Sequence, residues 1–255
     1  MALIEIERRD ATAIVRLNDP DRRNALSPEM RAEMLDKLDP LMADGACRCL
    51  VLTAAGSSFC AGGDLKSMRS GDPIYARHRM MATHRVVRLL AAGPKPVVAA
   101  VEGHAFGAGL SLAALADVCV ASRAATFGAV FGKVGLMADL GLLWSLPQRI
   151  GAARAKRLML TAGVLGADEA AELGLVDMLC EPGGALGAAL EVAAGFADRA
   201  PLPVAATRSA FAQMGDLDRA LALEVDLQSA LMASDDHAEG RAAFFERRDP
   251  VFRGR

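Results

Sequence analysis

The sequence has few aromatic residues and no excess of charge of either sign. Only 4% of its 255 residues are Phe, Trp or Tyr, while 53% are hydrophobic. The core must therefore be built from small aliphatic side chains that pack closely. Lys and Arg number 29 against 31 Asp and Glu, which gives a formal charge of -2 at pH 7. Because no net positive field attracts a polyanion, we expect no nucleic acid partner.

Long hydrophobic runs and paired cysteines are also missing. The longest uncharged apolar stretch, Ala105 to Ala116, has 12 residues and is too short to span a bilayer, so no membrane partner is expected. Charges interrupt the first ten residues, MALIEIERRD, which is unlike a signal peptide and predicts a cytoplasmic location. The five cysteines lack the CxxC spacing and the neighbouring His of metal sites, which predicts buried reduced thiols and no metal.

Strand-like and helix-like patterns alternate along the first two thirds of the chain. Apolar and polar residues alternate over residues 3–17 around Arg9 and Asp10, which predicts a β-hairpin. Ser27 followed by Pro28 predicts the start of a helix that runs to about Ala43. Further apolar strands are expected at 48–54, 96–102 and 117–122, with helices at 74–92 and up to residue 116. Short connections between them predict an α/β fold with buried strands.

The pattern becomes helical only after residue 183. We therefore predict an α/β core over residues 1–183 and a helical region over 184–255. The helical region is too thin to form a core alone, so it should pack on the α/β core or on another subunit. Its apolar stripe comprises Leu217, Leu221, Leu223, Val225 and Leu231.

Two glycine-rich turns each follow a predicted strand and precede a helix. They are FCAGGDL at 59–65 and GHAFGAG at 103–109. Glycines let backbone N–H groups point outward, and the first N–H groups of a helix have no intrahelical partner. Two such turns can flank one anionic oxygen, although each turn alone is more often only a turn. A P-loop is excluded because no GK[ST] follows, and Leu112 stands where a dinucleotide fingerprint needs its third glycine.

Five sequence blocks, in this order and spacing, resemble the crotonase (enoyl-CoA hydratase/isomerase) superfamily over nearly the whole chain. They are RRNALS (22–27), FCAGGDLKSM (59–68), KPVVAAVEGHAFGAGLSLAALADV (95–118), FGKVGLMADLGLLWSLPQRIG (131–151) and the closing EGRAAFFERRDPVFRGR. The chain looks most like the bacterial phenylacetyl-CoA-pathway isomerases. The resemblance implies an α/β spiral of ββα repeats, the ClpP-like crotonase fold, followed by a C-terminal helical trimerisation region. It also implies a homotrimer or dimer of trimers that acts on an acyl-CoA thioester, with no cofactor besides the coenzyme A of the substrate.

The same resemblance assigns roles to individual residues. The backbone N–H groups of Gly63 and Ala108 would polarise the thioester carbonyl. The substrate and its coenzyme A would be lined by Arg23, Ala25, Leu26, Ala61, Gly62, Asp64, Leu65, Phe106, Gly107, Ser111, Phe131 and Gly135. Acyl specificity would depend on Met68, Met80, Phe131, Met137 and Trp144.

The expected acid and base groups differ from those of hydratases in this superfamily. Hydratases carry two glutamates that activate water, and here Ser111 and Phe131 stand at those positions. Asp139 stands where some isomerases carry an aspartate that shuttles a proton. This implies isomerisation of an enoyl-CoA double bond with Asp139 as acid and base, and burial should raise its pKa. Outside the family context, a lone Asp before a helix is more often an N-cap.

Other functions remain open from the sequence. Hydration is one of them. Hydrolysis or dehalogenation with Asp139 as nucleophile is another, because His84 stands where a related aryl-CoA dehalogenase places a histidine. Next to Arg79 and Arg85, however, His84 is more typical of a solvated helix face. His104 is interpreted as a residue at the edge of the pocket. A third possibility is a non-catalytic acyl-CoA-binding protein. A triad of Ser111 with His237 and Asp235 or Asp236 is disfavoured, because the serine would lie inside a helix.

Overall fold

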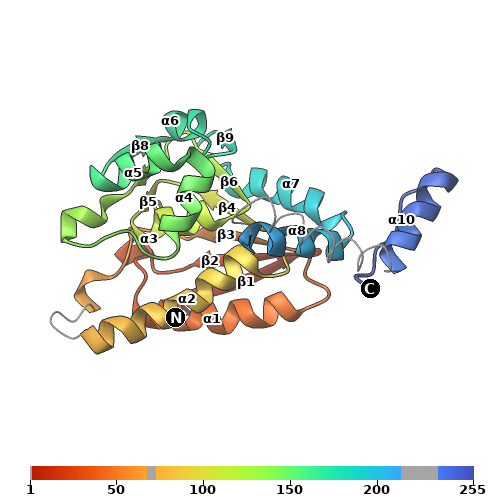
Figure 1. Ribbon diagram of the computed structural model, residues 1–255, viewed down its shortest axis with the longest axis horizontal. Helices are drawn as coiled ribbons and strands as arrows, with labels where there is room; N and C mark the ends of the chain where they lie inside the picture. The colour runs from red at the N-terminus through yellow and green to blue at the C-terminus, as the bar shows by residue number, and fades with distance from the viewer. Residues whose placement is uncertain (1, 68–72, 214–234) are drawn as a thin grey trace.

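The computed structural model describes residues 2–67, 73–213 and 235–255, and within these ranges it contains two sheets (Figure 1). The six-stranded sheet has the order β1-β2-β3-β4-β6-β9, and the three-stranded sheet has the order β5-β7-β8. The strands are β1 (Ile4–Arg9), β2 (Thr12–Leu17), β3 (Cys49–Ala54), β4 (Val97–Val101), β5 (His104–Phe106), β6 (Val118–Ser122), β7 (Thr126–Gly128), β8 (Val164–Gly166) and β9 (Met178–Cys180). Beyond the β1-β2 hairpin, the large sheet is parallel.

Helices connect these strands and cover both faces of the large sheet. They are α1 (Pro28–Ala43), α2 (Pro73–Ala92), α3 (Ala108–Leu115), α4 (Leu142–Ile150), α5 (Ala152–Leu160), α6 (Ala167–Glu172), α7 (Ala185–Ala197), α8 (Pro201–Gln213) and α10 (Asp235–Glu246). Short 3-10 turns span Pro20–Arg22, Leu65–Ser67 and Val130–Val134. The mixed α/β architecture predicted from the sequence is confirmed. None of the helices in the described residues is long and apolar enough to cross a membrane.

The hairpin and the first helix have the predicted boundaries. Ile4 lies opposite Leu17 and Arg9 lies opposite Thr12, with Asp10 in the left-handed region at φ 51°. The Ser27 hydroxyl accepts a hydrogen bond from the amide of the third helical residue at 3.1 Å, which is the N-cap that begins α1. Local turn and cap chemistry therefore determines this part of the fold.

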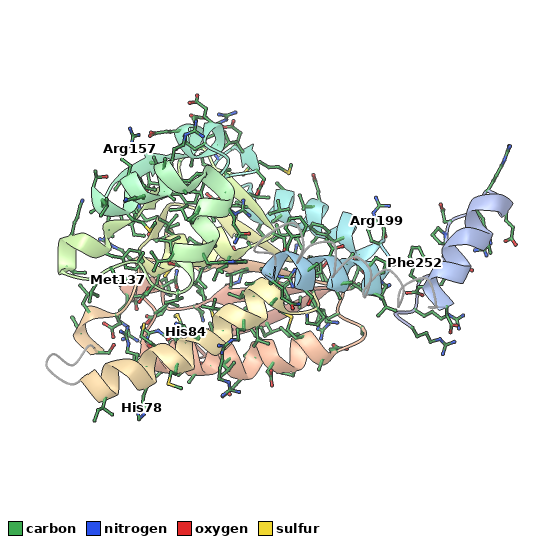
Figure 2. The ribbon with its side chains drawn as sticks, in the orientation of Figure 1. His78, His84, Met137, Arg157, Arg199 and Phe252 are labelled. Atoms are coloured by element: carbon green, nitrogen blue, oxygen red, sulfur yellow. The ribbon has the colours of Figure 1, made fainter. Side chains whose placement is uncertain are left out.

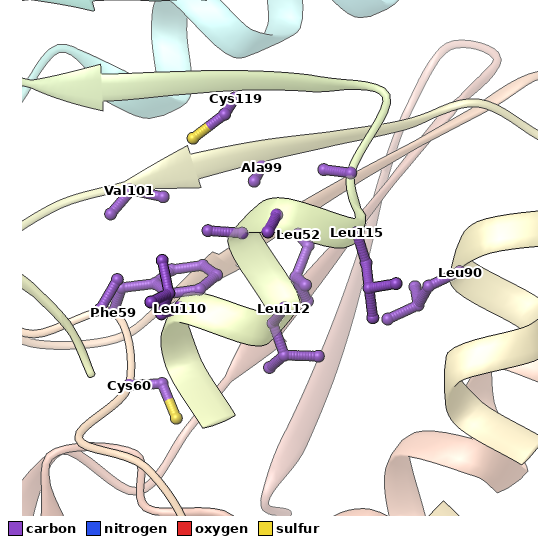
Figure 3. Close-up of a cluster of buried hydrophobic side chains, with 14 of the residues drawn as sticks. Leu52, Phe59, Cys60, Leu90, Ala99, Val101, Leu110, Leu112, Leu115 and Cys119 are labelled. Atoms are coloured by element: carbon purple, nitrogen blue, oxygen red, sulfur yellow. The ribbon is translucent and has the colours of Figure 1, made fainter. Parts of the chain in front are cut away.

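The core consists of small aliphatic side chains on both faces of the large sheet. On one face α3 inserts Leu110, Leu112 and Leu115 among residues of the strands and of α2, as Figure 3 shows. On the other face α7 packs Ala185, Ala189 and Ala193 onto six strand residues, since alanine lets a helix approach a sheet closely. The six strand residues are Ile14, Cys49, Val51, Val98, Ala100 and Val120. All five cysteines are free thiols, four of them buried, as predicted.

The region 184–255 therefore begins with a helix that belongs to the packed core. α8 follows α7 and contacts α2, whereas α10 stands apart from the two sheets in Figure 1. The predicted apolar stripe from Leu217 to Leu231 lies outside the described residues. The domain boundary at residue 183 stays a prediction.

The segment GHAFGAG was predicted as a turn, and that prediction is wrong for residues 104–106, which form β5. This strand pairs with β7, and β7 pairs in turn with β8; neither β7 nor β8 was predicted as a strand. Each has only three residues, so its stability comes from hydrogen bonds to distant segments and not from a local pattern. For β5, the amide of Cys60 donates to the carbonyl of His104 and the amide of Phe106 donates to the carbonyl of Cys60, both at 2.9 Å.

A buried ion pair ties α8 to the rest of the chain. Arg208 is 6% exposed, and its Nε donates to both carboxylate oxygens of Asp117 at 3.0 and 2.9 Å. Its remaining nitrogens donate to the carbonyls of Leu90 and Gly93 at the end of α2. Asp117 in turn accepts from the amide of Val97 at 2.7 Å. One guanidinium thus joins α8, α2, β4 and the segment that enters β6.

We expect Arg208→Ala to destabilise the protein by about 3–5 kcal/mol, because it leaves a partly buried carboxylate and two carbonyls without a donor. Urea unfolding followed by circular dichroism measures this change. The control is Arg157→Ala on α5, whose side chain is exposed and whose loss should cost less than about 0.5 kcal/mol. Equal stability of the two variants would show that the ion pair does not hold α8 in place.

Candidate active site

The two glycine-rich turns lie against each other at the ends of β3 and β4. Cys60 and Ala105 form a parallel bridge between them. At Gly109, the second residue of α3, an added Cβ would lie 2.3 Å from the carbonyl oxygen of Cys60. Only glycine permits this approach, so the start of α3 is fixed directly on the first turn.

Two backbone donors are left unused where the turns meet. Gly62 has φ 114°, and a Cβ there would lie 3.2 Å from the oxygen of Phe106 and 3.9 Å from the nitrogen of Ala108. The amide of Gly107 is used, since it donates to a carbonyl of β7 at 2.8 Å. Among the described residues, the amides of Gly63 and Ala108 donate to no protein acceptor. Two neighbouring free N–H groups, one of them at a helix N-terminus, can donate hydrogen bonds to an anionic oxygen.

The segment RRNALS runs alongside the first turn. The amide of Leu26 donates to the carbonyl of Gly62 at 2.8 Å, and the amide of Asp64 donates to the carbonyl of Leu26 at 3.3 Å. The amide of Ala61 donates to the carbonyl of Arg23 at 2.9 Å. The structure therefore brings Arg23, Ala25 and Leu26 together with residues 61–64, as the resemblance implied.

Asn24 holds this segment in place, and sequence reasoning missed it. Its side chain is fully buried, and its Nδ2 donates to the carbonyls of Ala55 and Ser58, both at 2.8 Å. Its Oδ1 accepts from the amide of Asp19 at 2.8 Å. Asn24 has φ 55°, a left-handed conformation that Asn tolerates better than most residues. An Asn between charged and apolar residues is the signal that indicates such a turn.

Ser111 links α3 to the segment that carries Asp139. The serine is fully buried. Its hydroxyl can donate to the carbonyl oxygen of Asp139 at 3.0 Å and to that of Gly107 at 3.2 Å. Ser111 is one turn of α3 beyond Ala108, so this contact places the Asp139 backbone near the free N–H groups. Phe131 is 8% exposed, and its ring lies 3.9 Å from where a Cβ on Gly107 would be.

The carboxyl group of Asp139 is half-buried and, among the described residues, unpaired. Its Oδ1 is buried and has no hydrogen-bond partner among the described residues. Burial raises the pKa of Asp139 above its ordinary value, and the positive charges of Arg79, Arg31 and His84 oppose that rise. The N-cap interpretation is wrong, because the N-cap of α4 is Gly141 and no side chain caps this helix. Asp139 contributes only its carbonyl, which accepts from the amide of Leu142 at 3.1 Å.

The cationic residues around Asp139 come from α1 and α2. Arg31 of α1 is 8% exposed, and one of its terminal nitrogens donates to the carbonyl of Leu26. Arg79, which precedes His84 on α2, is half-buried, and its Nε is buried. It shares a stripe of α2 with Thr83 and Val86, which are 1% and 2% exposed. His84 is exposed, as predicted, and Figure 2 shows it on α2.

The remaining predicted site residues lie at the surface or outside the described ranges. Leu65, Met137 and Trp144 are exposed, and Gly135 lies in an exposed left-handed turn at φ 71°. Met68 is outside the described residues. His104 is exposed, and its Nδ1 lies 2.8 Å from the hydroxyl of Thr126.

The alternative of a serine hydrolase triad is wrong. Ser111 lies inside α3, and its hydroxyl is bound to two backbone carbonyls. His237 belongs to α10, which is at the opposite end of the molecule from α3 in Figure 1.

Comparisons with known proteins agree with this geometry. The enoyl-CoA hydratase/isomerase family model matches residues 7–255. A 1,2-epoxyphenylacetyl-CoA isomerase of Escherichia coli is 37% identical over 94% of each chain. A crotonyl-CoA hydratase of Syntrophomonas wolfei is 33% identical over 98% of this chain and 97% of its own. The crystal structure of an enoyl-CoA hydratase from Bacillus anthracis superposes with a TM-score of 0.93 at 28% identity, covering 99% of this chain and 100% of the other.

These matches confirm the crotonase fold and the resemblance to the superfamily that contains the phenylacetate-pathway isomerases. With two free N–H groups between its glycine-rich turns and a family match over almost its full length, the chain is an acyl-CoA enzyme and belongs to the enoyl-CoA hydratase/isomerase family.

Proposed function

We propose that this enzyme isomerises an enoyl-CoA, with Asp139 as the group that moves the proton. The observation that supports this most strongly is the Oδ1 atom of Asp139, which is buried and without a partner beside the two free backbone donors. A carboxylate that has lost part of its hydration and is not neutralised by an ion pair is a stronger base than one in solvent. The same group can return the proton, because its pKa is raised toward neutrality.

The reaction requires one proton to leave the α-carbon of a 3-enoyl-CoA and one to arrive at the γ-carbon. Asp139 takes the α proton, and the electrons of the C–H bond move into a dienolate whose negative charge lies on the thioester oxygen. The N–H groups of Gly63 and Ala108 donate hydrogen bonds to that oxygen. Asp139 then gives the proton to the γ-carbon, and the double bond becomes conjugated with the thioester. Atoms and electrons balance without a further reactant, so we propose no cofactor besides the coenzyme A of the substrate.

The substrate site that we propose follows the first turn. Ala25, Ala61, Asp64 and Leu65 would contact coenzyme A together with Arg23, which is exposed. Phe106, Gly107 and Phe131 would line the acyl group next to the free donors. These assignments rest on the hydrogen bonds that join the RRNALS segment to residues 61–64 and on the contact of Phe131 with Gly107.

A second candidate is isomerisation of an aryl epoxide attached to coenzyme A. The relative from Escherichia coli is named for that reaction and is 37% identical to this chain. A panel of thioesters separates the candidates: 3-enoyl, 2-enoyl, aryl-epoxide and haloaryl CoA esters. Conversion of the 3-enoyl esters supports our proposal. Release of halide or free acid supports Asp139 as a nucleophile, and tight binding without any turnover supports a non-catalytic protein.

Hydration of crotonyl-CoA should be slower than in a two-glutamate hydratase of the family by a factor of roughly 10²–10⁴ or more. Neither Ser111 nor Phe131 can activate water, and general acid–base assistance is typically worth that factor for each group. The loss of absorbance of the conjugated thioester measures hydration directly. A family hydratase with both glutamates serves as the control, and an equal rate for this chain would contradict the assignment of these two positions.

We also propose that the chain forms a trimer or a dimer of trimers through residues 184–255. The proposal follows from the family resemblance and from α10, which stands apart from the two sheets (Figure 1). Light scattering at micromolar concentration should report a mass of three or six chains. A stable monomer under these conditions would exclude the proposed assembly.

A further inference from the structure

Arg79 is a half-buried charged residue on a stripe of α2 that is otherwise buried. The residues that follow it on the same stripe are Thr83, Val86 and Leu90, which are 1%, 2% and 1% exposed. Thr83 donates its hydroxyl to the carbonyl of Arg79 at 2.8 Å, so its own polar group is satisfied within the helix. A stripe of this kind normally carries apolar residues at every position. An arginine on it requires a polar partner in the space that the stripe faces.

The segment that carries Asp139 packs against this helix. At Gly141, two residues after Asp139, an added Cβ would lie 2.9 Å from Val87 and 3.3 Å from Leu115. α2 therefore packs directly on the segment that carries the catalytic carboxyl group. Among the neighbouring groups that oppose the rise in the pKa of Asp139, Arg79 contributes most.

Arg79 and Asp139 nevertheless do not form an ion pair. Within the part of the chain that the structure describes, Nε of Arg79 and Oδ1 of Asp139 are both buried, and each lacks a hydrogen-bond partner. A buried donor without an acceptor costs about 1–3 kcal/mol, and more when it is charged. Native proteins pair nearly all such atoms. An unpaired donor on a residue whose charge acts on an unpaired carboxylate therefore points to a ligand that offers an acceptor to Arg79.

The other cations near Asp139 are less suited to hold such a ligand. Arg31 already donates to the carbonyl of Leu26, and this hydrogen bond helps to hold the segment beside the first glycine-rich turn. His84 is exposed to solvent on α2. Arg79 alone combines a buried donor atom with a place on the face of α2 that packs toward the Asp139 segment.

We propose that Arg79 binds an oxygen atom of the acyl group, so that the preferred substrate carries an oxygen function, such as a carboxylate or a ring oxygen, in addition to its thioester. This inference rests on the proposed function, because it takes the space next to Asp139 to be the acyl site. It narrows the substrate class from enoyl thioesters in general to those with a polar acyl group. Arg79 is then a residue that determines specificity.

The test compares two substrates of equal chain length, 3-hexenoyl-CoA and its ω-carboxylate, 3-hexenedioyl-CoA. For Arg79→Met we expect kcat/KM to fall at least about 10-fold further on the carboxylate ester than on the hydrocarbon ester, mainly through KM. The loss of a positive charge near Asp139 affects both esters alike. Arg79→Lys should recover part of the loss. The control is Arg85→Met, which removes an exposed charge from the same helix. An equal loss on both substrates would overturn the proposal, since Arg79 would then act only through Asp139.

A binding measurement separates this inference from the proposed function. In an Asp139→Asn background, calorimetry should show that 3-hexenedioyl-CoA binds more tightly than 3-hexenoyl-CoA, and that Arg79→Met removes the difference. If that difference is found while the wild-type enzyme isomerises neither ester, the proposed reaction fails and the Arg79 site stands. If the wild-type enzyme isomerises both esters and the affinities are equal, the reaction stands and the Arg79 site fails.

Discussion

Asp139→Asn should abolish isomerisation while leaving the fold and the affinity for CoA esters intact. Asn has the shape of Asp but cannot accept a proton, so the loss should be at least about 10²–10⁴-fold in kcat. The assay is the gain of ultraviolet absorbance when a 3-enoyl-CoA becomes its conjugated 2-enoyl isomer, measured beside a thermal melt. Activity retained by this variant would transfer the role of base to His84 or Asp64.

The sign of the pKa shift gives two further expectations for the same variant. Since burial raises the pKa of Asp139, kcat of the wild-type enzyme should fall on the acid side at a pH above the ordinary range of an aspartate. The folded state then binds this proton more readily than the unfolded state does. The group therefore adds stability only as the pH falls through its raised pKa, and at neutral pH its charged form opposes folding.

At neutral pH the melting temperature of Asp139→Asn should accordingly equal or exceed that of the wild type. A collapsed melting temperature would instead indicate that the side chain has a structural task. The structure argues against such a task, because the carboxylate does not cap α4 and its Oδ1 bonds to no described residue.

Ala108→Pro should lower turnover by roughly 10²–10³-fold, because it removes one of the two N–H groups that hold the enolate oxygen. Proline is tolerated at the first position of a helix, where Ala108 lies, so the variant should fold. The measurement is kcat on the 3-enoyl-CoA, with circular dichroism to confirm the fold.

The matched control for this variant is Ala152→Pro, which changes the first residue of α5, also after a glycine, at an exposed position. This control should retain wild-type activity. A folded Ala108→Pro enzyme with full activity would mean that the amide of Ala108 does not contact the reacting oxygen.

Much of the fold was predictable because local chemistry determines it. The Ser27 cap and Pro28 set the start of α1, and the alternation around Asp10 set the hairpin. β5, β7 and β8 were not predictable from local patterns, since three-residue strands depend on partners far away in the chain. The two glycine-rich turns were visible in the sequence, but only the pairing of Cys60 with Ala105 brings them together.

The residues around Asp139 were harder to predict. An arginine on a helix with neighbouring His and Arg indicates a solvated face. The Nε of Arg79 is nevertheless buried, because α2 packs on the segment that carries Asp139. Ser111 stood out only as a missing glutamate. Its structural role, a hydroxyl that holds the backbone of Asp139, depends on a contact between segments 28 residues apart. Such contacts form between distant segments and therefore produce no regular spacing of residues in the sequence.

The most direct test of the account follows the fate of the proton. The wild-type enzyme is mixed with a 3-enoyl-CoA in deuterated water, and the product is examined by nuclear magnetic resonance. We expect a conjugated 2-enoyl-CoA with deuterium at the γ-carbon in the fraction where Asp139 exchanged its proton with solvent, and no product with Asp139→Asn. Binding of the ester by the wild-type enzyme with neither double-bond migration nor exchange of the α proton would contradict the proposal that Asp139 forms an enolate held by Gly63 and Ala108.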